Sequence, residues 1–218
     1  MEKQQLSKDP YNIVITGVGG QGNVMASRLL ANMLVRKGCH VTIGETFGAS
    51  QRGGSVMSHL RVSAGSVWSP QIPKGRADII AALEPVEALR VLMRYGNPGV
   101  MVLTNTRPLY PVAVIGGELD YPSPEEIRAT VKELSAYAWF IAATDEAIKL
   151  GNPILGNIVM IGAIAGTGEL PISREDFREA FLNSMSATKL DVNLRAFDLG
   201  VEKVKQAGGL KPAPAPPE

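Results

Sequence analysis

The sequence predicts an α/β protein: a three-layer α/β/α, Rossmann-like domain whose sheet is mostly parallel and carries an antiparallel hairpin. The first observation is a short run rich in β-branched residues, 12–16, which leads through a glycine-rich turn into apolar residues spaced three or four apart. The second is that two short apolar segments, residues 77–83 and 99–104, alternate with helical patterns. Parallel strands that are buried on both faces have this composition.

Size and composition limit the classes of function. The chain has 218 residues, and we expect one domain over residues 11–207 with flexible ends at 1–10 and 208–218. Its 22 basic and 21 acidic side chains give a net charge of +1, which does not favour nucleic acid or a membrane surface as a partner. No signal pattern occurs at the N-terminus and no apolar run approaches the roughly 20 residues that span a bilayer, so we expect a cytoplasmic protein.

The chain contains one cysteine, Cys39. A single thiol excludes an internal disulfide. It also excludes an iron–sulfur cluster held by this chain alone, because such a cluster typically needs about four thiolates. We expect Cys39 to lie at the start of a buried strand, where a thiol behaves as a small apolar group.

The glycine-rich turn is the first candidate binding site. Glycine lets a ligand approach the backbone, and the following helix start offers free N–H groups and the positive end of its dipole, so a phosphate is the expected guest. A purely structural turn is the alternative. An acidic residue, Glu45, ends the next predicted strand 23 residues after the last glycine. The predicted contacts in the turn are Gly17, Val18, Gly19, Gly20, Gln21 and Gly22.

A second glycine-rich loop follows the strand that ends at Glu45. In open α/β sheets ligands lie outside the carboxyl ends of the strands, so this loop and the glycine turn should face one ligand. The residues of the loop that we assign to the site are Ser50, Gln51, Arg52 and Gly53. The alternating segment 55–62 then predicts a strand, paired in a hairpin with residues 67–68, in which His59 lies on a half-exposed face.

The remaining predicted elements, from residue 85 onward, are mostly helices. Residues 105–122 read as loop with one short edge strand, and residues 152–166 as a buried helix packed against the sheet or a subunit. The other predicted elements are a helix at 85–94, a helix from Ser123 to about 136, a strand at 139–144, a short helix capped by Asp145, a helix at 173–185 with Asp176 in its cap, and a helix at 191–201.

Together the two glycine-rich motifs point to a family. Residues 16–22, followed by Ser27 and Arg28, and then residues 44–56, resemble the gamma component of 2-oxoacid:acceptor oxidoreductases. The Gln-Arg-Gly-Gly sequence at 51–54 is most similar to the beta subunit of the indolepyruvate ferredoxin enzymes. The resemblance extends from residue 12 to about 200 and includes Asn157 and Asn193.

The resemblance implies a role for this chain as a subunit without catalytic residues or metal of its own. Coenzyme A would contact the glycine turn, the neighbourhood of Glu45, Asn157 and Asn193. Pyruvate-type enzymes have a lysine near the position of Glu45, and Arg52 would supply that positive charge here. A larger partner would hold thiamine diphosphate, magnesium and 4Fe–4S clusters, and would pass electrons from indolepyruvate or another aryl 2-oxoacid to ferredoxin or an NAD-linked acceptor, releasing an acyl-CoA.

Two other functions remain open at this point. One is a self-contained NAD- or FAD-dependent oxidoreductase, in which Glu45 bonds a ribose hydroxyl, although no convincing acid–base pair follows it in the chain. The other is a non-catalytic scaffold subunit whose glycine turn binds nothing.

Overall fold

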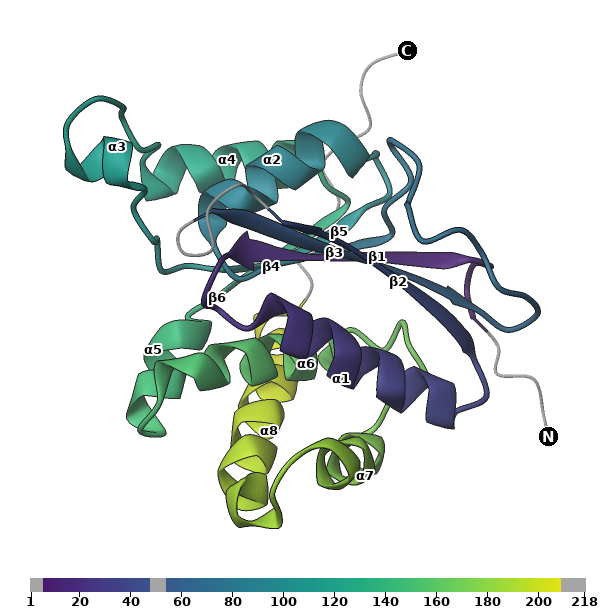
Figure 1. Ribbon diagram of the computed structural model, residues 1–218. Coiled ribbons are helices and arrows are strands. Elements are labelled where there is room, and N and C mark those ends of the chain that lie inside the picture. Colours follow the sequence, from purple (N-terminus) through teal and green to yellow (C-terminus); the bar gives the residue numbers. More distant parts are fainter. Residues whose placement is uncertain (1–5, 48–53, 209–218) are drawn as a thin grey trace.

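The computed structural model describes residues 6–47 and 54–208 and shows a sheet between two helical layers (Figure 1). In the described part the sheet has six strands in the order β2-β3-β1-β4-β5-β6. These strands are β1 (Tyr11–Val18), β2 (His40–Phe47), β3 (Ser55–Ser63), β4 (Ile79–Ala82), β5 (Met101–Asn105) and β6 (Tyr137–Ile141). The predicted three-layer α/β fold is confirmed.

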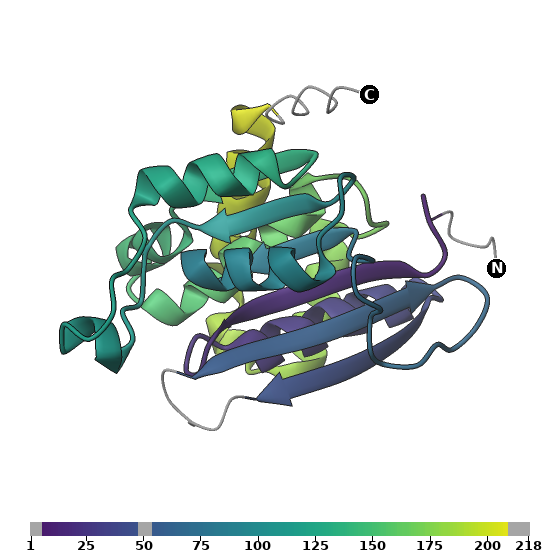
Figure 2. The ribbon, with the colours of Figure 1, turned by 90° about the horizontal axis from the view of Figure 1, so that it is seen from above.

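Helices cover both faces of the sheet. On one face lie α2 (Pro85–Tyr95) and α4 (Pro124–Glu133), with α3 (Val112–Ile115) standing out from the body (Figures 1 and 2). The other face carries α1 (Asn23–Arg36), α5 (Ala143–Lys149), α6 (Gly156–Gly166), α7 (Arg174–Ser184) and α8 (Leu190–Ala207), with single 3₁₀ turns at Pro153–Leu155 and Ala187–Lys189. Each face has its own apolar core, and alternate residues of β1, such as Ile13 and Val14, contribute to the two.

The antiparallel strand β3 lies between β1 and β2. It pairs with both, so that Leu60 lies opposite Ile13 of β1 and opposite Ile43 of β2. The prediction of an antiparallel hairpin is correct, but its predicted partner at residues 67–68 is wrong, because those residues form no strand. The predicted half-exposure of His59 is also wrong. It is 3% exposed, packs edge-on against Tyr95, and its Nδ1 accepts the backbone N–H of Ile72.

Local signals placed most helix ends correctly. Ser123 and Ser173 each form a capping box, the second with Asp176 as predicted. Three details differ from the predictions. Residues 112–115 form the helix α3 instead of an edge strand, α5 begins before Asp145 with Ala142 at its N-cap, and α8 continues to Ala207.

Helices α6 and α8 cross at very short distance through glycine. A Cβ atom on Gly162 would lie 2.0 Å from the backbone oxygen of Phe197, and one on Gly200 would lie 1.9 Å from that of Val159. Residues 156–164 of α6 are buried throughout, which is the core packing that their apolar composition indicates. The helix α6 therefore serves as the central support of this face of the sheet.

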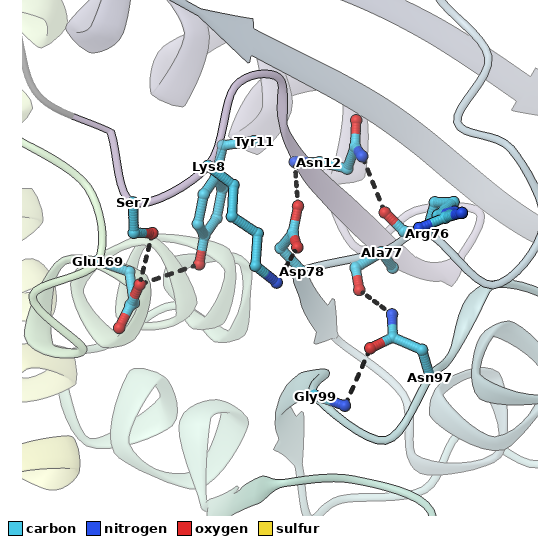
Figure 3. Close-up of polar contacts among 10 residues, drawn as sticks. All are labelled: Ser7, Lys8, Tyr11, Asn12, Arg76, Ala77, Asp78, Asn97, Gly99 and Glu169. Atoms are coloured by element: carbon cyan, nitrogen blue, oxygen red, sulfur yellow. Dashed lines mark hydrogen bonds and ion pairs between the residues drawn. The ribbon is translucent and has the colours of Figure 1, made fainter.

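The residues just before β1 contact the folded domain, although the sequence suggested a loose lead-in. Ser7 Oγ donates to Glu169, and Lys8 Nζ lies 2.7 Å from the buried carboxylate of Asp78 (Figure 3). The same carboxylate accepts the backbone N–H of Asn12 at 2.8 Å. Asp78 therefore joins the start of β1 to the start of β4.

Asp78→Ala is expected to lower the free energy of unfolding by about 2–3 kcal/mol, because the buried N–H of Asn12 loses its charged acceptor. Lys8→Ala should cost no more than about 0.5 kcal/mol, since the lysine side chain is more than half exposed. Urea denaturation of the two variants checks this. Equal losses of unfolding free energy in the two variants would mean that the ion pair with Lys8, and not the hydrogen bond from Asn12, accounts for the contribution of Asp78 to stability.

Candidate functional site

A pocket of about 380 Å³ lies at the carboxyl ends of the parallel strands. This volume falls within the roughly 300–1,000 Å³ that is typical of small-molecule sites. Its walls come from the glycine turn after β1, the ends of β4 and β5, and the start of α5 and α6. The lining residues are Gly20, Gln21, Leu83, Asn105, Leu109, Ala143, Thr144, Asn152, Pro153, Ile154, Gly156 and Asn157.

The glycine turn is held in one conformation by the side chain of Gln21. Gln21 Oε1 accepts the N–H of Val18 at 2.9 Å, and Nε2 donates to the carbonyl oxygen of Leu83 at 2.9 Å. Gly20 and Gly22 have φ of 103° and 83°, a region that favours glycine. A Cβ atom on Gly17 would lie 2.6 Å from Gln21 Oε1, so this glycine makes room for the bracing side chain.

The helix α1 begins directly after the turn without a side-chain cap. Gly22 occupies the N-cap position, and among the described residues no side chain accepts a hydrogen bond from the first N–H groups of the helix. Within residues 6–47 and 54–208, the N–H groups of Gly20, Gly22, Asn23 and Val24 have no hydrogen-bond acceptor. Uncapped amides and the positive end of the helix dipole together favour an anion, and phosphate is the usual one.

Asn157, at the start of α6, reaches the same turn. Its Nδ2 donates to the carbonyl oxygen of Gly22 at 3.4 Å, whereas its Oδ1 is buried and has no partner among the described residues. Asn23 Oδ1 is likewise buried and unpaired among the described residues, although Asn23 does not line the pocket. Buried polar atoms are rarely left without a partner, so Asn157 Oδ1 is an acceptor available to a donor group of a ligand in this pocket.

Glu45 lies apart from the turn. Its carboxylate is 3.7 Å from Nε of Arg28 on α1. In the register of the sheet, Glu45 lies opposite Ser58 of β3, which lies opposite Ile15 of β1, so a whole strand separates Glu45 from β1. A dinucleotide site needs the acid on the strand beside β1 to reach the ribose, and this arrangement therefore counts against the NAD or FAD alternative.

The structure shows the positions of only some of the other predicted contacts. Gly19 N donates to Gly54 O at 2.8 Å, so the end of the second loop does adjoin the turn. The loop residues Ser50, Gln51, Arg52 and Gly53 lie outside the described residues. Asn193 does not line the pocket: it is buried at the start of α8, where its Nδ2 donates to Lys189 O at 2.8 Å. The roles of these residues stay predictions.

The sequence analysis missed Asn105, the last residue of β5. Its Nδ2 donates to Leu83 O at 3.0 Å and to Thr144 Oγ1 at 2.9 Å, and its Oδ1 accepts the N–H of Thr144. It thereby joins the end of β5 to the residue after β4 and to the start of α5. An asparagine directly after a buried apolar strand was a usable signal, since binding residues gather at this edge.

A smaller pocket of about 180 Å³ lies next to the first, toward α4. Tyr110, Tyr121 and Phe140 line it together with Arg128, whose guanidinium lies 4.6 Å from the ring centre of Phe140. The hydroxyl of Tyr121 donates to the buried carboxylate of Glu84. Burial and this hydrogen bond raise the pKa of Tyr121 far above its usual range, so it remains a neutral donor.

No helix in the described part of the chain combines the length and the apolar character that crossing a bilayer requires.

Comparison with known proteins finds relatives that match most of the chain. The indolepyruvate oxidoreductase subunit IorB of Pyrococcus horikoshii is 44% identical over 198 residues, which cover 90% of this chain and 96% of that protein. The subunit of the same name from Thermococcus kodakarensis is 43% identical and covers 92% of this chain and 98% of its own length.

Solved structures share the fold. A 2-oxoglutarate:ferredoxin oxidoreductase from Magnetococcus marinus, with 2-oxoglutarate, coenzyme A and succinyl-CoA bound, has a TM-score of 0.73 at 22% identity. The match covers 94% of this chain and 33% of that one. A family model described as pyruvate ferredoxin/flavodoxin oxidoreductase matches residues 12–203. The resemblance seen in the sequence is confirmed, and the chain belongs to the pyruvate ferredoxin/flavodoxin oxidoreductase family.

Proposed function

We propose that this chain is the coenzyme A-binding subunit of an indolepyruvate ferredoxin oxidoreductase, an enzyme that decarboxylates an aryl 2-oxoacid and releases an acyl-CoA. The observation that carries the proposal is the unpaired Oδ1 of Asn157 beside the uncapped start of α1, in one pocket at the carboxyl edge of the sheet. The names of the relatives supply the substrate class, and the coenzyme A bound in a solved structure of the same fold supplies the ligand.

In this proposal, the chain binds and orients and does not itself break a bond. The backbone amides of the turn hold a phosphate group, Asn157 Oδ1 accepts from a donor of the same ligand, and the hydrogen bonds of Asn105 hold the residues around the pocket in place. A larger partner subunit would supply thiamine diphosphate, magnesium and iron–sulfur clusters. The single cysteine of this chain cannot hold such a cluster alone.

The experiment measures coenzyme A binding to the assembled complex by calorimetry under anaerobic conditions. We expect Asn157→Ala to weaken binding about tenfold or more, because a charged or amide hydrogen bond in a buried site contributes about 1–3 kcal/mol. Asn183→Ala is the matched control and should weaken binding less than threefold, since Asn183 is exposed on α7 and does not line the pocket. Equal effects of the two variants, or no effect of either, would contradict the proposed site.

The exposed helix α3 and its flanks form the surface that we assign to the partner. The side chains of Val112, Ile115 and Leu119 are 85%, 74% and 63% exposed. Leu109, which lines the pocket, and Tyr110, which lines the smaller aromatic pocket, lead into this surface, so a partner resting on it would close over the site. Adjacent exposed apolar side chains on one projection are a recognised sign of a protein interface.

Ile115→Glu is expected to reduce co-purification of the larger subunit at least tenfold, because a charge would have to be buried in an apolar contact. Met93→Glu is the control: Met93 is 84% exposed on the outer surface of α2. Retention of the complex by both variants, or its loss in both, would show that α3 is not the docking surface.

A further inference from the structure

A third pocket, of about 470 Å³, lies at the opposite end of the strands, near the start of β1. Asn12 lines this pocket, whereas the glycine turn follows the far end of the same strand. At about 3.3 Å per residue, the two sites are roughly 20 Å apart. The proposed function assigns no role to the pocket near the start of β1.

The pocket carries an excess of positive charge. Lys8, Arg61 and Arg76 line it, and Asp78 is the one carboxylate among the lining residues. Asp78 is already engaged, because it pairs with Lys8 at 2.7 Å and accepts the N–H of Asn12 (Figure 3). The two guanidinium groups therefore remain without a counter-charge among the described residues.

Arg61 is the unusual member, because its side chain is charged and yet the residue is only 7% exposed. In the described part of the chain its polar partners are neutral: Nε donates to Asn12 Oδ1 at 3.1 Å, Nη1 donates to Ser69, and the guanidinium lies 4.9 Å from the ring centre of Trp68. Burial lowers the pKa of Arg61, but a guanidinium stays protonated in proteins. Buried charges are normally paired, so the missing partner of Arg61 needs an explanation.

Arg76 contributes an exposed positive charge, and hydrogen bonds hold its backbone in place. Its carbonyl oxygen accepts from Asn12 Nδ2 at 2.8 Å, and the next carbonyl, of Ala77, accepts from Asn97 Nδ2 at 2.7 Å (Figure 3). The side chain of Arg76 takes no part in these bonds and is exposed. The walls of the pocket are therefore formed before any ligand arrives.

We propose that this pocket binds the phosphate or carboxylate group of a small molecule, with Arg61 as the buried counter-charge and Arg76 as the accessible one. The forked geometry of guanidinium suits planar or tetrahedral oxyanions and favours paired hydrogen bonds. The ligand is thus an anionic metabolite or effector that binds remote from the coenzyme site.

The test uses inorganic phosphate as the probe and the full chain as the protein. Phosphate is titrated at constant ionic strength against chloride, and the shift in Tm is converted to an apparent Kd. We expect Arg76→Ala to weaken phosphate binding about tenfold, the equivalent of one charge-assisted hydrogen bond. Arg195→Ala removes the same charge from an exposed position of α8 and should leave binding unchanged.

Gly22→Ala separates this pocket from the glycine turn, and Arg61→Lys, which keeps the charge, guards against misfolding. Binding that survives Gly22→Ala but falls in Arg76→Ala and in Arg61→Lys supports the pocket described here. A phosphate effect that is absent in the wild-type chain, or equal in wild type and Arg76→Ala, overturns the proposal. It is also overturned if Arg76→Glu releases the larger subunit while phosphate has no effect, because the pocket then receives a carboxylate of that subunit.

Discussion

Gly22→Ala should reduce coenzyme A affinity by about a hundredfold, which corresponds to about 3 kcal/mol. A Cβ atom at this position would lie 2.2 Å from Asn157 Nδ2, so the asparagine must swing away and withdraw its Oδ1 from the pocket. The φ of 83° adds a backbone cost of roughly 1–2 kcal/mol, because alanine adopts this region poorly. Calorimetry of the assembled complex measures the affinity.

Gly168→Ala is a control that introduces backbone strain at a positive φ without a steric clash. Gly168 has a φ of 75°, but nothing lies within 4 Å of the position that an alanine Cβ atom would take, and it follows the far end of α6. This control should lose about 1–2 kcal/mol of stability and keep its coenzyme A affinity. An unchanged affinity in Gly22→Ala would show that the contact between the turn and α6 is not part of the binding site.

Gly200→Ala should have the largest effect on stability, about 4 kcal/mol, which exceeds the usual cost of overpacking. The new Cβ atom would lie 1.9 Å from Val159 O and 2.6 Å from Ala163 N, and both are backbone atoms of a buried helix. Neither can rotate away, so α8 must move off α6 as a body. In a helix alanine is normally more stable than glycine by about 1 kcal/mol. The expected loss in Gly200→Ala therefore comes from the steric clash with α6.

Chemical denaturation of the isolated chain measures this loss, with Gly65→Ala as the comparison. A Cβ atom added at Gly65 would meet open space, and the residue lies in the connection after β3, so its change should stay within about 0.5 kcal/mol. A loss below about 1 kcal/mol in Gly200→Ala would mean that the two helices separate easily, contrary to their close crossing.

The elements that depend on local chemistry could be predicted from the sequence. The glycine turn, the buried strands and the capping boxes at Ser123 and Ser173 each follow from a few neighbouring residues. The four apolar residues 112–115 carry too little periodicity to separate a short strand from a helix, and the prediction there was wrong.

Strand order could not be predicted in the same way, because it depends on partners far apart in the chain. The alternating pattern of residues 55–62 identifies a strand but does not say that it inserts between β1 and β2. That insertion decides the place of Glu45, which would otherwise lie beside β1. The burial of His59 likewise depends on the distant Tyr95 and on Ile72, whose backbone bonds to it.

The candidate site likewise contains residues that local sequence identifies and residues that it does not. The residues of the glycine turn could be predicted from their spacing, and Asn157 was predicted from the resemblance to a family. The structure adds that Asn157 lines the pocket and that its buried Oδ1 is unpaired among the described residues. Asn105 and Asn23 enter only when the strand ends and the turn are seen together.

The most direct measurement is the structure of the assembled complex with coenzyme A bound. The account predicts a phosphate group of the coenzyme within hydrogen-bond distance of the backbone amides of Gly20 and Gly22, and a ligand donor facing Asn157 Oδ1. Coenzyme A bound wholly within the larger subunit, with the glycine turn of this chain in contact only with protein, would contradict it.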